Sequence, residues 1–240
     1  MRRTHDAIPP LFDLSAEAKE SCNMIHSPSF LGYTRLGAET TAARTDIREY
    51  PDHPGAQALV EEYMTKIDEL AQKFVHLVAE CLSLPADTFD DFKGKMSRLK
   101  FVKYPASAPD SQGVGPHKDS AGLFTFLSQD NIGGLQVLNK NGEWIDVPPV
   151  DGSLVINIQQ GFEAITGGVC AATTHRVIAP TSQTRYSIPY FLGVRLDLTL
   201  DELKESAAHI VRRIPAADDR KKRAVDVPSE FLSPLYACVR

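Results

Sequence analysis

Two histidines and one aspartate near the middle of the chain could bind a metal ion together. His117 and Asp119 lie two residues apart, and in an extended segment such positions project to the same side of the backbone. His175 lies in a segment typical of a β-strand, which an antiparallel fold can return to the same point. Two imidazoles and one carboxylate leave positions open on iron(II), as oxygenases require, although the same ligands also suit zinc. A His-x-Asp pair alone is a weak signal, so further residues must support this interpretation.

Arg185 and Ser187 could bind a carboxylate. They stand two residues apart in a second predicted strand and therefore share one face of it. A guanidinium donates two parallel charge-assisted hydrogen bonds to a carboxylate, and the hydroxyl adds another donor. Beside a metal with open positions, this pair suggests a dicarboxylic keto acid that chelates the metal at one end and binds Arg185 at the other.

Apolar periodicity predicts the elements that would position these side chains. Residues Pro54 to Leu84 repeat apolar side chains at three- and four-residue steps, which predicts a long amphipathic helix. Shorter helices are predicted at 15–24, with Ser15 as N-cap, and at 201–213. Seven short segments, separated by turn signals such as Gly133-Gly134, predict strands at 99–102, 123–127, 135–138, 144–147, 154–158, 173–178 and 185–194. We interpret Gly133-Gly134 as a hairpin turn, and the closely spaced strands favour an antiparallel sandwich or barrel.

The order and spacing of these motifs resemble the isopenicillin-N-synthase-like family of iron(II)/2-oxoglutarate-dependent oxygenases. The resemblance covers roughly residues 95–195 and rests on the segments 115–119, 128–130, 133–137, 142–149, 175–177 and 185–191. It implies a double-stranded β-helix, or jelly roll. It also implies iron(II) ligands at His117, Asp119 and His175, and a 2-oxoglutarate clamp at Arg185 and Ser187. Tyr104, which precedes a proline, matches a tyrosine that often also contacts the cosubstrate.

The resemblance further implies a dioxygenase that uses iron(II), 2-oxoglutarate and O2 and releases succinate and CO2. Its substrate is expected to be a small molecule of secondary metabolism, oxidised by hydroxylation, desaturation or cyclisation. The walls of the substrate pocket are expected from 30–50, 101–103, Phe162 and the C-terminal tail. Two alternatives stay open: an oxidase of the same fold that needs no 2-oxoglutarate, and a metal-binding but inactive jelly-roll protein.

We expect one structural domain, mainly β with α, in three parts. These are a helical N-terminal region over 1–94, the jelly-roll core over 95–200, and a C-terminal helix and tail over 201–240. The N-terminal region is expected to be shorter than in most relatives, and a further stretch is expected to be missing around 50–54. Residues 26–54 show no period and are predicted as loop.

Two departures from the family pattern lie close to the predicted ligands. Lys118 occupies the position between His117 and Asp119, where relatives have a small residue. Gln159-Gln160 stand where relatives typically have Gly-Asp. The structure must show whether the chain accommodates these larger side chains beside a metal.

Composition narrows the classes of partner. Hydrophobic residues make up 42% and charged residues 24%, as in ordinary globular domains. The formal net charge of -5 gives no electrostatic reason to expect nucleic acid or an anionic membrane as partner. Four widely spaced cysteines without a CxxC pair are read as free thiols in a reducing compartment. We therefore predict a cytoplasmic monomer.

Overall fold

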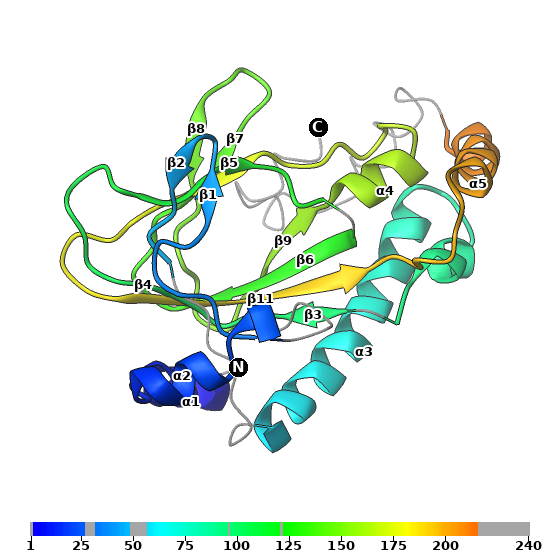
Figure 1. The fold of residues 1–240 in the computed structure, drawn as a ribbon. Coiled ribbons are helices and arrows are strands. Elements are labelled where there is room, and N and C mark those ends of the chain that lie inside the picture. Colours follow the sequence, from blue (N-terminus) through cyan, green and yellow to red (C-terminus); the bar gives the residue numbers. More distant parts are fainter. Residues whose placement is uncertain (1, 27–31, 49–56, 96, 121, 216–240) are drawn as a thin grey trace.

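Two antiparallel sheets form the centre of the computed structural model, which describes residues 2–26, 32–48, 57–95, 97–120 and 122–215 (Figure 1). The first sheet has the order β5 (Gln112–His117), β10 (His175–Ile178), β7 (Leu135–Leu138) and β8 (Trp144–Asp146). The second has the order β3 (Arg98–Leu99), β11 (Arg185–Gly193), β6 (Gly122–Gln129) and β9 (Val155–Ile158), and β4 (Val102–Tyr104) also pairs with β11. The predicted mainly β fold with antiparallel strands is confirmed.

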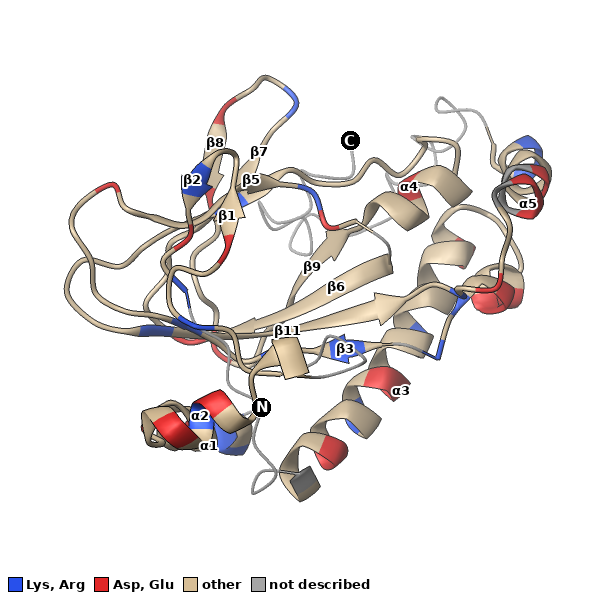
Figure 2. Cartoon of the chain, in the orientation of Figure 1, with Lys and Arg blue, Asp and Glu red and all other residues tan. Residues whose placement is uncertain are grey.

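A small apolar cluster fills the space between the two sheets. Its members come from both sheets and the segments beside them: Val102, Tyr104, Val114, Leu127, Leu135, Val137, Val147 and Val177. β6 and β9 contain no charged residue and are tan throughout in Figure 2, whereas charges of both signs lie on α2, α3 and α5. Because strand side chains alternate between faces, the same strands present a second apolar face to the helices.

The predicted strands are confirmed, with two differences, and one predicted turn is wrong. Segment 99–102 divides into β3 and β4, and β5 was not predicted as a strand because its glycines and proline give it little strand propensity. The interpretation of Gly133-Gly134 as a hairpin turn is wrong. Both glycines have positive φ, but the chain crosses there from β6 in one sheet to β7 in the other. A Cβ on Gly134 would lie 2.6 Å from the carbonyl oxygen of Ile178, so this crossing also requires a close backbone approach.

The long predicted helix is α3 (Gln57–Cys81), which packs on the outer face of β6 and β11 (Figure 1). Its buried residues recur every four positions, so one stripe faces the sheet: Tyr63, Ile67, Ala71, Val75 and Ala79. Phe74 places its ring edge-on to Phe124 and Phe126, at centroid distances of 5.2 and 5.5 Å. Ser83, at φ 61°, ends the helix in the left-handed region.

The N-terminal segment forms two helices rather than one. The predicted helix at 15–24 is the shorter α2 (Ala16–Ser21), and Ser15 caps it as expected by accepting from the backbone N–H of Ala18. α1 (Arg2–Phe12) was not predicted, and it buries Ile8 and Phe12 beside β11 despite two prolines in its last turn. Part of the predicted loop 26–54 is a small hairpin of β1 (Thr40–Thr41) and β2 (Arg44–Thr45), while the stretch expected to be missing around 50–54 lies outside the described residues.

Short helices complete the fold. They are η1 (Met24–His26), η3 (Ala86–Phe92), α4 (Gln160–Ile165) and α5 (Leu200–Arg213). α5 confirms the helix predicted at 201–213 and begins with a reciprocal capping box between Thr199 and Glu202. α4 was not predicted. Within the described ranges, no helix is long and apolar enough to cross a membrane.

Candidate metal centre

Strand pairing brings the predicted ligands together. β10 runs antiparallel to β5, and His175 is the register partner of His117, so the two imidazoles lie side by side with ring centroids 4.3 Å apart. Asp119 follows β5 by two residues, and its Oδ1 lies 3.6 Å from Nε2 of His117 and 3.8 Å from Nε2 of His175. One ligand atom of each residue lies within 4.8 Å of the other two.

Hydrogen bonds at the far ring nitrogens set the tautomers. Nδ1 of His117 lies 2.8 Å from the carbonyl oxygen of Gly115, and Nδ1 of His175 lies 3.0 Å from that of Thr173. A carbonyl oxygen can only accept, so in the neutral ring each Nδ1 carries the proton and each Nε2 keeps its lone pair. Both lone pairs then belong to atoms that face a carboxylate at 3.6 to 3.8 Å. Only acceptors meet at this point, which is an arrangement that a cation stabilises, and imidazole and carboxylate ligands fit iron(II).

The carboxylate of Asp119 is held by residues that sequence reasoning did not select. Thr125 Oγ1 donates to Oδ2 of Asp119 at 2.5 Å, and Nε2 of Gln159 donates to Thr125 Oγ1 at 2.9 Å. Oε1 of Gln159 accepts from the backbone N–H of Gly122 at 2.8 Å. Gln159, at a position where the family resemblance led us to expect glycine, therefore orients Thr125, which in turn orients Asp119.

Electrostatics keep Asp119 ionised and His175 neutral. Burial works to raise the pKa of Asp119, but contacts with His117, His175 and Thr125 outweigh it and hold that pKa below its ordinary value. Burial and the neighbouring His117 lower the pKa of His175, and Asp119 offsets only part of this. An ionised carboxylate at Asp119 and a neutral imidazole at His175 are the forms that metal binding needs.

Lys118, between two predicted ligands, points away from the metal position. Its Nζ lies 3.2 Å from Oε2 of Glu163 on α4. The same carboxylate oxygen accepts from the backbone N–H of Ala172 at 3.0 Å, three residues before His175. Lys118 and Glu163 therefore join the two segments that lead to the ligands.

The predicted clamp lies inside the barrel. Arg185 is fully buried, and its guanidinium lies over the ring of Tyr104, 4.9 Å from the centroid, where β4 pairs with β11. Nη2 donates to Oε1 of Gln129 at 2.9 Å, while Nε and Nη1 have no hydrogen-bond partner among the described residues. Ser187, two residues further along β11 and on the same face, is also buried. A buried charge with two unpaired donors is costly, and a carboxylate would satisfy both.

The sheets bring the clamp and the metal position into one interior. A Cβ on Gly113 would lie 3.1 Å from the ring of Tyr104, so β5 passes directly beside the clamp. Four residues further along the same strand is His117. Extended chain rises about 3.3 Å per residue, so the backbone positions of Gly113 and His117 lie about 13 Å apart.

Comparison with a protein-family model supports the predicted family. Residues 94–194 match the family model described as the 2OG-Fe(II) oxygenase superfamily. Over these residues the chain is similar to the 2OG-Fe(II) oxygenase superfamily. The predicted family is thereby confirmed, and with it iron(II), 2-oxoglutarate and O2 as the cofactors of such proteins.

Two fungal relatives and one solved structure show how far the similarity extends. The chain is 41% identical to the 2-oxoglutarate-dependent dioxygenase frbJ of Dothideomycetidae sp., over 80% of the chain and 62% of the relative. It is 36% identical to a 2-oxoglutarate-dependent dioxygenase of Gibberella zeae, over 84% of the chain and 65% of the relative. The chain thus spans less than two thirds of the length of either relative.

The crystal structure of a full-length Neurospora crassa protein in complex with alpha-KG superposes with a TM-score of 0.71 at 23% identity, covering 89% of this chain and 81% of that one. This likeness supports the predicted jelly-roll fold of the 2OG-Fe(II) oxygenase core. It extends beyond residues 94–194, since it covers most of the chain.

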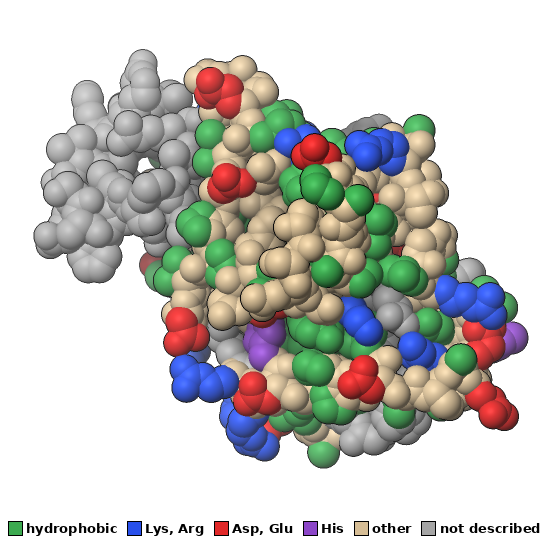
Figure 3. All heavy atoms as spheres, turned by 90° about the vertical axis from the view of Figure 1, so that its left-hand side faces the viewer, with side chains coloured by type: hydrophobic (Ala, Val, Ile, Leu, Met, Phe, Trp, Pro, Cys, Tyr) green, Lys and Arg blue, Asp and Glu red, His purple; other side chains and the backbone are tan. Residues whose placement is uncertain are grey.

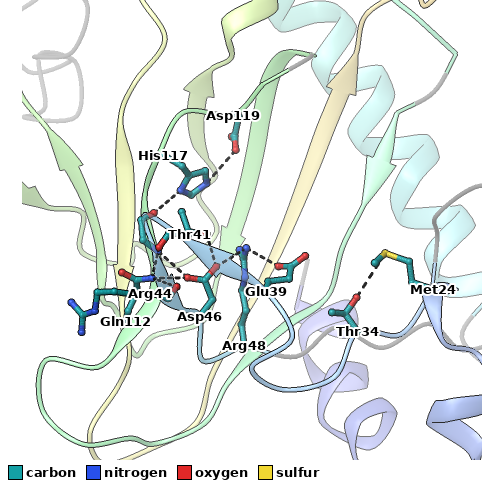
Figure 4. Close-up of polar contacts among 11 residues, drawn as sticks. Met24, Thr34, Glu39, Thr41, Arg44, Asp46, Arg48, Gln112, His117 and Asp119 are labelled. Atoms are coloured by element: carbon teal, nitrogen blue, oxygen red, sulfur yellow. Dashed lines mark hydrogen bonds and ion pairs between the residues drawn. The ribbon is translucent and has the colours of Figure 1, made fainter.

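The structure corrects part of the expected substrate pocket. Phe162 is fully buried in the core on the helix side, with its ring 4.8 Å from that of Phe89, so it does not line the barrel. Phe101 packs against the same core, and Lys103 lies over the ring of Phe12 on α1. The segment before residue 49 contacts β5 through Asp46, which accepts from the backbone N–H of Gly115 two residues before His117 (Figure 4).

Proposed function

We propose that this protein is an iron(II)- and 2-oxoglutarate-dependent dioxygenase that oxidises a small organic molecule. His117, Asp119 and His175 bind the iron, and Arg185 with Ser187 binds the distal carboxylate of 2-oxoglutarate. The observation that carries the proposal is the coexistence of the two unsatisfied features in one barrel. Three acceptor atoms converge on a point that suits a cation, and beside them a buried guanidinium has two donors without partners among the described residues.

Each side chain has a separate task in this proposal. The carbonyl oxygens of Gly115 and Thr173 hold the protons of the two imidazoles at Nδ1, so that both Nε2 atoms face the metal. Thr125 keeps Asp119 ionised and oriented. Gln129 holds one arm of the Arg185 guanidinium, and the Tyr104 ring supports its flat face. Iron(II) with 2-oxoglutarate and O2 supplies the oxidant, and the cosubstrate leaves as succinate and CO2.

The substrate is proposed to be a small molecule of secondary metabolism. Hydroxylation, desaturation and cyclisation all begin with the loss of a hydrogen from the substrate, and the site can serve each of them. On the face shown in Figure 3, Lys and Arg side chains are interspersed with Asp and Glu side chains, so the described residues there offer a polyanion no extended basic surface. A cytoplasmic location and a monomeric state stay predictions from the sequence.

The deciding experiment measures 2-oxoglutarate binding and turnover separately. The iron(II)-loaded protein is titrated with 2-oxoglutarate without O2, and succinate is then measured after O2 is admitted. Binding followed by succinate formation supports the proposal. Iron binding without 2-oxoglutarate binding would favour the oxidase, which would use Arg185 for its own substrate. A protein that binds both and forms no succinate with any substrate offered would favour the inactive alternative.

A further inference from the structure

A buried carboxylate lies behind the metal centre, on the segment that precedes the barrel. Asp46 is fully buried and accepts from four side-chain or backbone groups (Figure 4). Oδ2 accepts from Thr41 Oγ1 at 2.6 Å and lies 3.0 Å from Nη2 of Arg48. Oδ1 accepts from Nε2 of Gln112 at 2.8 Å and from the backbone N–H of Gly115 at 3.2 Å.

The local sequence alone does not explain this arrangement. The hairpin turn between β1 and β2 is formed by Ala42 and Ala43, both at positive φ, a conformation that alanine adopts only at a cost. Nε2 of Gln112 also contacts the carbonyl oxygens of Thr41 and Arg44, at 2.9 and 3.0 Å. Contacts to β5 therefore hold the strained hairpin, and Asp46 makes two of them.

Gly115 connects Asp46 to a predicted iron ligand. Its backbone N–H donates to Asp46, and its carbonyl oxygen accepts from Nδ1 of His117. A Cβ at this position would lie 2.8 Å from the carbonyl oxygen of Thr41, so the residue must be glycine for the two segments to meet. Pro116 follows directly, and its ring restricts the backbone between Gly115 and His117.

We propose that Asp46 is a positioning residue for the metal centre, which acts through Gly115 to set the orientation of the His117 imidazole. The proposal rests on the assignment of His117 as an iron ligand. Outer groups that orient a ligand typically change metal affinity or activity by about 10- to 100-fold when they are lost. We expect Asp46→Asn to fall near the lower end, since the amide keeps one acceptor but directs an N–H group at other donors.

The test compares the two histidines within one sample. Zn(II) serves as a diamagnetic probe, and the imidazole Nδ1–H signals of His117 and His175 are recorded by NMR. Asp46→Asn should shift the His117 signal, or speed its exchange with solvent, and leave the His175 signal in place. Co(II) affinity, measured by competition, should fall roughly tenfold.

Two further variants keep the test decisive. Thr41→Val removes one donor and keeps the carboxylate, so it should produce a smaller change in the same His117 signal even if Asp46→Asn does not fold. Asp68→Asn makes the same chemical change at a carboxylate that accepts from Tyr190 on the helix side, and it should move neither signal.

The outcomes separate the two proposals. Equal changes at both histidines, or no change at either with parental Co(II) affinity, would overturn the positioning role and leave the proposed function standing. A parent protein in which Zn(II) alters neither histidine signal would instead overturn the assignment of the ligands, and with it the proposed function.

Discussion

His117 and His175 face the same carboxylate from neighbouring strands, but the chain supports them differently. β10, which carries His175, lies between β5 and β7, so the ladder holds its backbone on both sides. β5 is the edge of that sheet, and His117 is its last residue. The side chain of His175 is 9% exposed and that of His117 is 29% exposed.

The difference shows how an edge position can be made rigid. His175 needs only its own strand and the carbonyl of Thr173, because neighbours already fix that backbone. His117 has the same kind of bond to Gly115, but Gly115 is fixed from outside the sheet by the segment around Asp46. The proposed ligand on the central strand is positioned by the ladder, and the proposed ligand on the edge strand by side chains from a distant part of the sequence.

The largest effect is expected from removing either ligand. His175→Ala and His117→Ala should each weaken iron(II) binding by more than the roughly 100-fold seen for outer groups, and abolish turnover, because two remaining ligands hold the metal poorly. Metal affinity is measured by competition under anaerobic conditions. If either variant bound iron(II) as tightly as the parent and still turned over, the assignment of that ligand would be wrong.

Changes at the proposed clamp should weaken 2-oxoglutarate binding without removing either histidine. A hydrogen bond to a charged group contributes roughly 1.5–3 kcal/mol, so Arg185→Ala should weaken 2-oxoglutarate binding by about tenfold to over a hundredfold. Arg185→Lys keeps the charge without the planar fork and should be impaired less, and Ser187→Ala least. The dissociation constant is measured with iron(II) bound and without O2. Unchanged constants across this series would move Arg185 out of the cosubstrate site.

A smaller loss of metal affinity is expected from changing the residues that hold Asp119, the third proposed ligand. Thr125→Val removes the donor to Asp119 while keeping the shape of the side chain, and one hydrogen bond of about 1 kcal/mol corresponds to about a fivefold loss of metal affinity. Gln159→Leu, one bond further away, should have less effect than Thr125→Val. The reverse order would show that Gln159 acts on the site by another route.

The smallest effect concerns pH and the metal-free protein. Burial lowers the pKa of His175, so below the ordinary histidine value of 6.5 the unfolded chain binds more protons than the folded one. The stability that this residue contributes is therefore present above about pH 6.5 and lost as the pH falls toward its folded pKa. The melting temperature should decrease between neutral and mildly acidic pH, and His175→Gln should reduce that slope. An unchanged slope would show that His175 titrates alike in both states.

Local patterns determined most of the chain's elements. The four-residue apolar repeat predicted α3, and β-branched and aromatic runs predicted the strands that fill both sheets. The ligand types and the spacing of His117 to Asp119 predicted the shared side of the metal centre, because extended backbone projects alternate residues together. Arg185 and Ser187 were predicted to share a strand face for the same reason, and the structure adds that both are buried.

Tertiary structure decided what no local pattern could carry. The β1–β2 hairpin has Ala42-Ala43 where a turn signal would have glycine or asparagine, so only its contacts with β5 reveal it. No local pattern gives Thr125 or Gln129 a role, and Gln159 stood out only as a departure from the family pattern. Pairing of β6 with β9 and β11 brings Thr125 to Asp119, Gln159 to Thr125 and Gln129 to Arg185. Asp46 lies far before His117 in the sequence, and its role depends on a long-range approach through Gly115. Residue types and short spacings define ligands, whereas the side chains that hold ligands in place come from wherever the folded chain brings them.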